Sequence, residues 1–180
     1  MTEFVAFPKM ARLSREVLIT EKIDGTNAQI CITEDGGFFV GSRTRWITPE
    51  DDNFGFAAWA HQNKAELMKL GVGSHFGEWW GKGIQRGYGL NERRFSLFNV
   101  SRWADDAVRP SCCHVVPLLY RGDFDTAHVN GQIGVLAMAG SVAAPGFMKP
   151  EGIVVYHVAG NIGFKKTIEK DDVPKGVARS

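Results

Sequence analysis

Several absences place this chain outside whole classes of protein. It has no apolar run of the roughly eighteen residues that a membrane-spanning helix needs, and no charged-then-apolar leader follows Met1, so we expect a soluble, cytoplasmic protein that binds no membrane. Its three cysteines include no C-x-x-C pair and cannot build a disulfide framework, which fits a reducing compartment. It also lacks an internal repeat, a low-complexity tract and an obvious linker. We therefore expect a single domain, residues 1–180.

The glycine-rich loops that bind phosphate in many nucleotide enzymes are missing too. GEWWGKG (residues 77–83) resembles a Walker A loop, but Lys82 is followed by Gly83 and the glycine spacing is one residue short. GVGSHFG and GKGIQRG each miss the G-x-G-x-x-G pattern by one residue. If the protein handles a nucleotide, it does so with side chains.

A large excess of charge of one sign is absent as well. The formal net charge is +1, so the molecule as a whole is not a polycation that attracts nucleic acid at long range. Local pairs of cations belong either to a solvated face or to a focused basic groove. These pairs are Arg43 and Arg45, Lys82 and Arg86, Arg93 and Arg94, and Lys165 and Lys166.

What is present is an ordinary globular composition, with 44% hydrophobic and 23% charged residues. Short strand-like runs occur along the whole chain, and the turns between several of them are of the hairpin type, such as Asp35-Gly36-Gly37 and Ala159-Gly160. The predicted strands cover residues 17–23, 27–33, 37–42, 74–80, 95–100, 114–120, 151–158 and 161–169.

Two segments predict helices. The first covers 53–70, with Asp52 or Asn53 as its cap and Gly71 as its end; the second covers 126–139, between Asp125 and Gly140. The expected buried stripe of the first consists of Phe56, Trp59, Ala60, Leu67 and Leu70. Many hairpin-joined strands with two substantial helices indicate an α+β fold of antiparallel sheets with flanking helices, not the βαβ alternation of a Rossmann fold.

The segment TEKIDGTNAQI (residues 20–30) places Lys22 between two carboxylates at a tight turn that joins two strands. A lysine amine is a nucleophile only when it is neutral, so a catalytic role requires cations or a metal ion nearby to offset Glu21 and Asp24. The alternative is a surface lysine at a strand end, paired with Glu21.

Four further segments carry residues suited to binding a nucleotide. GSRTR (41–45) has arginines on alternate positions, and Arg43 could contact phosphate or ribose. Glu78 lies in an aromatic strand, where a carboxylate needs a partner, a ligand or a metal. Phe98 in FSLFNV offers either a stacking face for a purine or a core side chain. Glu151 precedes a run of β-branched residues and could bind a hard metal ion.

In this order the segments resemble the motifs of the covalent nucleotidyltransferases, which include ATP-dependent DNA and RNA ligases and capping enzymes. K-x-D-G (22–25) resembles motif I, GSRTR motif Ia, GEWWG motif III, FSLFNV motif IIIa, EGIVV motif IV and GFKKT motif V. The form E-K-x-D-G-T-N is most similar to the Rnl2-like RNA ligases. The resemblance spans residues 21 to about 167 and implies a ligase adenylation domain.

The resemblance implies an ATP-dependent RNA ligase. Lys22 would attack the α-phosphate of ATP and hold AMP, which then passes to the 5′-phosphate of a polynucleotide before a 3′-hydroxyl seals the strand. Mg²⁺ or Mn²⁺ would assist, bound in part by Glu151. Lys165 would neutralise charge on the α-phosphate and favour the neutral amine of Lys22. The remaining residues that it implies for nucleotide binding are Glu21, Asp24, Gly25, Asn27, Arg43, Glu78, Phe98 and Lys166.

Two features depart from the family pattern. Motif V usually reads K-x-K, whereas Lys165 and Lys166 are adjacent and must face opposite sides of a strand; we expect Lys165 to point inward. Only fourteen residues follow Lys166, which leaves no room for the OB-fold domain of DNA ligases or the small C-terminal domain of the RNA ligases. Self-adenylylation is therefore expected of this chain, and a separate protein or a dimer could supply the missing surface.

Alternatives to an RNA ligase are a DNA ligase core and a binding module that keeps the fold without catalysis. Other segments were assigned no firm role. Adjacent Cys112 and Cys113 are poorly placed to share one zinc ion with His114, so we expect them to be structural. One of Trp79 and Trp80 could stack on bases while the other faces the core. Lys82 and Arg86 could contact phosphates or lie in a solvated loop.

Overall fold

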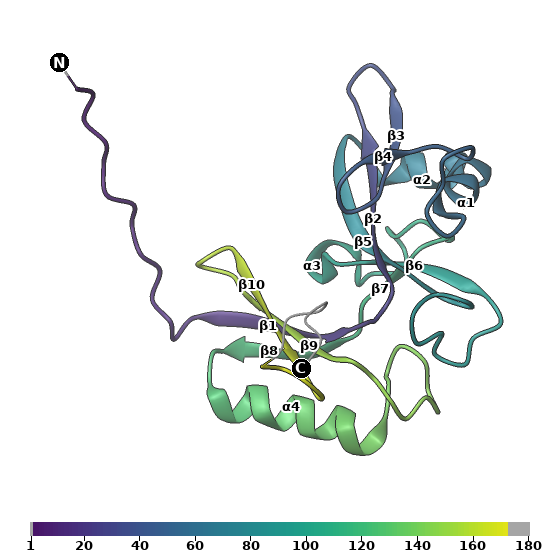
Figure 1. Ribbon diagram of the computed structural model, residues 1–180. Coiled ribbons are helices and arrows are strands. Elements are labelled where there is room, and N and C mark those ends of the chain that lie inside the picture. Colours follow the sequence, from purple (N-terminus) through teal and green to yellow (C-terminus); the bar gives the residue numbers. More distant parts are fainter. Residues whose placement is uncertain (1, 173–180) are drawn as a thin grey trace, which may run out of the picture.

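The computed structural model describes residues 2–172, which form two sheets, with the helices labelled α1, α2 and α4 on their outer sides (Figure 1). The small sheet is antiparallel throughout. Its strands, in spatial order, are β10 (Ile162–Thr167), β9 (Gly152–His157), β1 (Glu16–Lys22) and β8 (Leu118–Asp123). The predicted α+β class with antiparallel sheets is confirmed.

The large sheet has six strands and one parallel pair, at its β6–β7 edge. In spatial order it contains β4 (Trp46–Ile47), β3 (Phe38–Gly41), β2 (Thr26–Ile32), β5 (Gly73–Gly81), β6 (Arg93–Leu97) and β7 (His114–Val115). Strands β2, β3 and β5 match the predicted positions within two residues, whereas β4 was not predicted. Gly36, with a φ of 83°, makes the predicted turn between β2 and β3.

The predicted helix over 53–70 is divided into three pieces: α1 (Phe56–Gln62), α2 (Lys64–Leu67) and the 3₁₀ turn η1 (Met68–Leu70). The break is at Asn63, whose side-chain amide and backbone N–H both donate to the carbonyl of Trp59. The first piece begins at Phe56, three residues later than expected, and Gly55 occupies its N-cap position. Asp52 still serves the first turn, because its carboxylate accepts from the N–H groups of Ala57 and Ala58.

Two predicted strands are shorter than expected. The segment 95–100 leaves the large sheet after Leu97 and turns into α3 (Val100–Trp103), which is capped by the side chain of Asn99. The segment 114–120 divides at residues 116–117, because β7 belongs to the large sheet and β8 to the small one. Pro117 lies at this crossing and has no N–H to continue a ladder.

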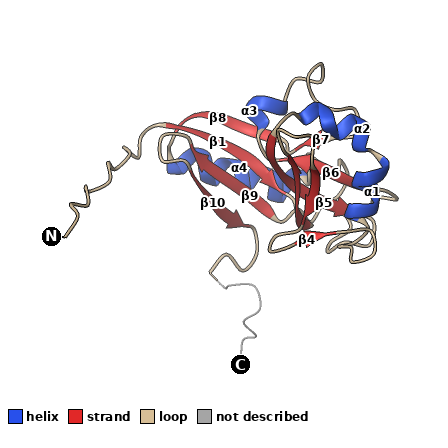
Figure 2. Ribbon diagram, turned by 90° about the horizontal axis from the view of Figure 1, so that it is seen from above, coloured by secondary structure: helices blue, strands red, loops and turns tan. Residues whose placement is uncertain are grey.

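Helix α4 (Thr126–Ala139) has the predicted bounds. Asp125 caps it by accepting from the N–H of Ala127, and Gly140, with a φ of 87°, ends it. It lies along the outer face of the small sheet, behind the strands in Figure 2 and on the side away from the large sheet in Figure 1. Its Leu136 is buried with Val17, Ile19, Ile153 and Val155 of that sheet.

Two further clusters complete the core. The largest lies between the large sheet and α1–α2 and includes Trp79; a smaller one lies between the two sheets and includes Trp80. Both tryptophans are therefore buried, on opposite faces of β5, so the interpretation of either as a base-stacking surface is wrong. Cys113 lies in the first cluster with Cys112 against it, which fits the structural role expected for both.

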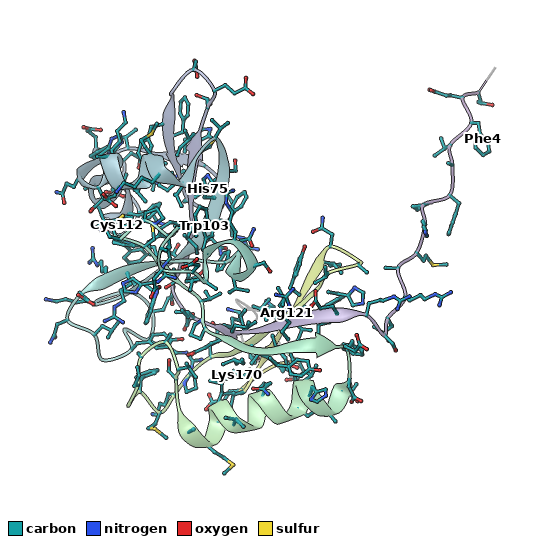
Figure 3. The ribbon with its side chains drawn as sticks, turned by 180° about the vertical axis from the view of Figure 1, so that it is seen from behind. Phe4, His75, Trp103, Cys112, Arg121 and Lys170 are labelled. Atoms are coloured by element: carbon teal, nitrogen blue, oxygen red, sulfur yellow. The ribbon has the colours of Figure 1, made fainter. Side chains whose placement is uncertain are left out.

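Residues 2–15 form neither helix nor strand and extend away from the sheets, with Phe4 at the far end (Figures 1 and 3). Within residues 2–172, no helix combines the length and apolar character that crossing a bilayer needs.

Candidate nucleotide-binding cavity

A cavity of about 770 Å³ lies between the two sheets, which is in the size range of small-molecule sites. Both sheets contribute polar side chains to its lining, with Lys22 and Lys165 from the small sheet and Asn27 and Glu78 from the large one. Arg43, in the loop after β3, and Phe98, just beyond β6, also line it.

Lys22 lies where the chain crosses from one sheet to the other. It is the last residue of β1, and Thr26 begins β2 four residues later, so residues 23–25 form the crossover. Gly25 makes this crossover possible: a Cβ there would lie 2.4 Å from the carbonyl oxygen of Trp79 and 2.7 Å from the Cβ of Trp80. The glycine of the K-x-D-G motif is thus required by close packing of the crossover on β5.

The amine of Lys22 is held by Glu151. Nζ lies 2.6 Å from Oε2 of that carboxylate, because Lys22 is in register with Gly152 at the start of β9. The Lys22 side chain is 20% exposed and that of Glu151 only 3%. The pair is therefore largely shielded from solvent, with the amine on the cavity side and the carboxylate beneath it.

Glu21 points to the other side of β1 and is almost fully buried. Its carboxylate accepts hydrogen bonds from the hydroxyl of Ser141, at 2.5 Å, and from the N–H groups of Val142 and Ala143, both at 2.8 Å. These bonds occupy the carboxylate and fix the segment that follows α4. A contact of Glu21 with a nucleoside would therefore come from its main chain.

Glu78 is the carboxylate most affected by its surroundings. It accepts from the N–H of Gly25 at 2.9 Å and from the side-chain amide of Asn27 at 3.2 Å. Burial raises the pKa of Glu78 to about 7, with the charges of Glu151 and Asp24 acting in the same direction. A carboxyl group that titrates near neutral pH in a cavity is characteristic of functional sites.

The two adjacent lysines of β10 are separated as strand alternation requires. Lys165 lines the cavity and is in register with Val154, which lines it too. Lys166 is on the other face, where its Nζ lies 3.5 Å from the carboxylate of Asp171. The inward position expected for Lys165 is the observed one, whereas Lys166, also expected to bind the nucleotide, is outside the lining.

Arg43 and Phe98 have the exposure that contact with a ligand requires. Phe98 is 41% exposed, unlike Phe95 and Leu97 of the same strand segment, which are fully buried. Arg43 is exposed and makes no ion pair within residues 2–172, whereas Arg45 pairs with Asp51 at 2.5 Å.

Asp24 and Gly25 do not line the cavity, although they were expected to bind the nucleotide. Asp24 instead pairs with Arg86, whose Nε lies 3.0 Å from its Oδ2. The same guanidinium also donates to the carbonyl of Lys149. Arg86 is therefore engaged with protein groups, and neither it nor Lys82 lines the cavity. Contact of these two cations with phosphates of a polynucleotide stays a prediction.

Several residues around the cavity were missed by the sequence analysis. Arg86 and Tyr88 hold Asp24, and Ser141 holds Glu21. The sequence analysis named Arg86 only as a phosphate contact or part of a solvated loop, and it gave Tyr88 no role. The lining residues Thr20 and Asn99 lie in the segments TEKIDGTNAQI and FSLFNV but were given no role, and no motif covers Ser101 or Ser141.

Comparisons with known proteins agree with this geometry. A family model described as RNA ligase matches residues 15–170. The fold resembles solved structures of Naegleria gruberi RNA ligase: a variant with AMP and Mn (24% identity, TM-score 0.62), a variant with ATP and Mn (23%, 0.62) and the ligase with PPi (23%, 0.59). Each match covers 86% of this chain but only 50% of the other, so the chain spans about half the length of those ligases. The search of curated proteins gives no match.

Proposed function

The chain belongs to the RNA ligase family within the nucleotidyltransferase superfamily, and from that premise we propose that it is an ATP-dependent RNA ligase that forms a lysyl-AMP intermediate on Lys22. The observation that carries the proposal is the position of the Lys22 amine, which reaches the cavity while bound to Glu151 at 2.6 Å. The cation Lys165 lines the same cavity.

In the first step, Nζ of Lys22 attacks the α-phosphorus of ATP. An N–P bond forms, the bond between the α-phosphorus and the bridging oxygen breaks, pyrophosphate leaves, and the amine passes a proton to the carboxylate of Glu151, which accepts its hydrogen bond. Glu151 orients the amine by accepting its hydrogen bond, and Lys165 meets the negative charge on the phosphate oxygens. Both groups are already in place, so little reorganisation is needed during the reaction.

The other wall of the cavity binds the nucleoside. Phe98 stacks on adenine, Glu78 accepts from the ribose hydroxyls, and Arg43 contacts phosphate or ribose. Asn27 and Glu21 contribute at the strand ends beside Lys22, Glu21 through its main chain. Asp24 and Gly25 act by shaping the crossover, because they do not reach the cavity.

A divalent cation, Mg²⁺ or Mn²⁺, would neutralise charge on the triphosphate. Within residues 2–172, no group of three or more His, Cys, Asp or Glu side chains could hold a metal ion alone. Mg²⁺ is commonly bound by one or two carboxylates together with substrate phosphates and water. We assign Glu151 as the protein ligand. It does not line the cavity and its Oε2 is bound to the Lys22 amine, so its other oxygen would hold the ion, with the remaining ligands supplied by ATP and water.

In the later steps, AMP passes to the 5′-phosphate of a polynucleotide, and a 3′-hydroxyl then displaces it to seal the strand. RNA is the favoured substrate because the chain belongs to the RNA ligase family. We assign residues 1–180 to a single adenylyltransferase domain.

The intact mass of the purified protein after incubation with ATP and Mg²⁺, or with ATP and Mn²⁺, tests the proposal. The sample is first treated with pyrophosphate to remove any AMP already attached. We expect a gain equal to one AMP in the wild type and none in Lys22→Ala. Absence of the gain in folded wild-type protein would contradict self-adenylylation.

The adenylylated protein is then offered nicked RNA, nicked DNA and hybrid duplexes. Sealing or AMP transfer on RNA supports the proposed substrate, whereas a preference for nicked DNA identifies a DNA ligase core.

A further inference from the structure

Arg86 links two segments that carry the reacting groups, although it is not in the cavity. Its Nε donates to Oδ2 of Asp24 at 3.0 Å, in the crossover that follows Lys22. Its Nη1 donates to the carbonyl of Lys149 at 2.9 Å and lies 3.4 Å from that of Pro150, directly before Glu151. One planar side chain thus connects the crossover to the segment that supplies the partner of the Lys22 amine.

The loop that carries Arg86 is built to hold this position. Two backbone hydrogen bonds between residues three apart fix its conformation. They run from the N–H of Ile84 to the carbonyl of Gly81 and from the N–H of Gly87 to the carbonyl of Ile84. Gln85 has a φ of 46° and Tyr88 a φ of 52°, both in the left-handed region that non-glycine residues rarely adopt. Strain of this kind persists only where surrounding contacts impose it.

Those contacts come from inside the molecule. The side chains of Ile84 and Tyr88 on either side of Arg86 are buried, at 0% and 2% exposure. The hydroxyl of Tyr88 accepts from the N–H of Asp24 at 2.8 Å, so the loop makes a second hydrogen bond to the crossover. The ring of Tyr88 packs on Phe147, in the segment that leads to Glu151, with centroids 4.6 Å apart.

We propose that Arg86 is a positioning residue for adenylylation, which acts through Asp24 and the Lys149–Pro150 carbonyls to keep the Lys22 amine on Glu151. The inference rests on the proposed function, since it assigns Arg86 to the adenylylation of Lys22. It assigns Arg86 no contact with ATP, because Arg86 does not line the cavity. Its loss therefore affects the rate constant of the chemical step more than the affinity for ATP.

The alternative is that Arg86 only stabilises the fold, as a partly exposed ion pair. The Arg86 side chain is 33% exposed, and pairs of that kind contribute little to stability. Loss of Arg86 should affect the reaction rate more than the stability of the fold. Small displacements of reacting groups, or loss of a residue that orients them, reduce rates by roughly 10- to 100-fold. The two interpretations can therefore be separated by kinetics.

The test measures single-turnover formation of Lys22-AMP across a range of ATP concentrations, in Arg86→Ala and in Arg93→Ala as a matched control. Arg93 also donates to two carbonyls, those of Lys82 and Phe54, but it contacts neither Asp24 nor the segment before Glu151. For Arg86→Ala we expect a rate constant about 10- to 100-fold lower, with the ATP concentration for half-maximal rate within about threefold of wild type. Arg93→Ala is expected to keep the wild-type rate constant.

A conservative variant and a double-mutant cycle test whether Arg86 acts on the adenylylation rate through Asp24. Arg86→Lys keeps the charge but cannot span Asp24 and two carbonyls at once, so we expect only partial recovery. If Arg86 acts through Asp24, the double variant Asp24→Asn with Arg86→Ala loses little more than the worse single variant.

Three results would overturn the proposal: an Arg86→Ala rate constant near that of wild type, an equal loss in Arg93→Ala, or losses that multiply independently in the double variant. If the wild type itself forms no Lys22-AMP, the proposed function fails and this inference fails with it. Should Arg86→Ala not fold, the same criteria apply to Arg86→Lys.

Discussion

The two sheets that enclose the cavity differ in what they carry and in how they hold it. The wall formed by the small sheet presents charged groups that can react with or neutralise phosphate, namely Lys22, supported by Glu151, and Lys165. The wall formed by the large sheet presents an aromatic ring, hydrogen-bonding groups and one cation in the loop after β3, namely Phe98, Asn27, Glu78 and Arg43. We therefore describe the first as the reactive wall and the second as the recognition wall.

The difference also appears in the local contacts. On the reactive wall, the Lys22 amine makes an ion pair with a carboxylate that is almost fully buried. On the recognition wall, Glu78 is held by an N–H group and an amide, and its pKa is raised to about 7. We propose that the reactive wall, which carries cations, faces the phosphates of a nucleoside triphosphate. The recognition wall, where burial favours the neutral form of a carboxyl group, would face its nucleoside.

The largest effect is expected on the reactive wall, where Lys165→Ala removes the cation that we propose to meet the α-phosphate. Loss of one preorganised group of this kind costs about 10²- to 10³-fold in rate. The measurement is the single-turnover rate constant of Lys22-AMP formation. Lys166→Ala is the matched control, because this neighbouring lysine faces Asp171 and lies outside the lining. Equal losses in the two variants would contradict the assignment of Lys165.

On the recognition wall, Glu78 should make stability depend on pH. With a pKa of about 7 when folded and 4.5 as the reference value, the folded protein binds the proton more tightly than the unfolded chain. The free energy of unfolding therefore falls as pH rises from about 4.5 to about 7, by about 3 kcal/mol from this group.

Denaturant unfolding at pH 5 and pH 8 measures this contribution. Glu78→Gln keeps an acceptor for the N–H of Gly25 and cannot ionise, so its loss of stability between the two pH values should be smaller than that of the wild type. Glu34→Gln, which changes an exposed carboxylate, should leave the wild-type pH dependence intact. The same pH dependence in wild type and Glu78→Gln would contradict the raised pKa.

The smallest effect is expected for Phe98→Ala, which removes the proposed stacking surface for adenine. Stacking of a base on an aromatic side chain contributes roughly 1–3 kcal/mol, so we expect the ATP concentration for half-maximal adenylylation to rise about tenfold. The maximal rate constant should change less. Phe39, 47% exposed and outside the lining, provides the control Phe39→Ala. If that control matches Phe98→Ala, the recognition wall has been assigned wrongly.

Local patterns were enough to predict much of this architecture. Helix α4 was located to the residue because its signals are adjacent in sequence, with Asp125 at one end and Gly140 at the other. The first helix was located but its break was not, since Asn63 interrupts it by a bond to Trp59 that propensity does not reveal. Strand alternation separated Lys165 from Lys166, and the tertiary packing then determined which of them faces the cavity.

The contacts that hold the candidate site were not predictable from the sequence alone. Lys22 meets Glu151 across 129 residues, Glu21 meets Ser141 across 120, and Asp24 meets Arg86 across 62. Such pairings depend on the strand order of the small sheet and on the path of the 81–90 loop. The family motifs indicated which residues belong together, but not that Asp24 and Glu21 would be turned away from the cavity.

The crossover from β1 to β2 has a mechanical consequence. Only residues 23–25 separate Lys22 in one sheet from Thr26 in the other, so this joint is a natural axis for any rotation of one sheet against the other. Displacement in a rotation grows with distance from the axis. A change in the opening between the sheets would therefore move the mouth of the cavity much further than it moves Lys22, so the cavity could open and close around a nearly stationary amine.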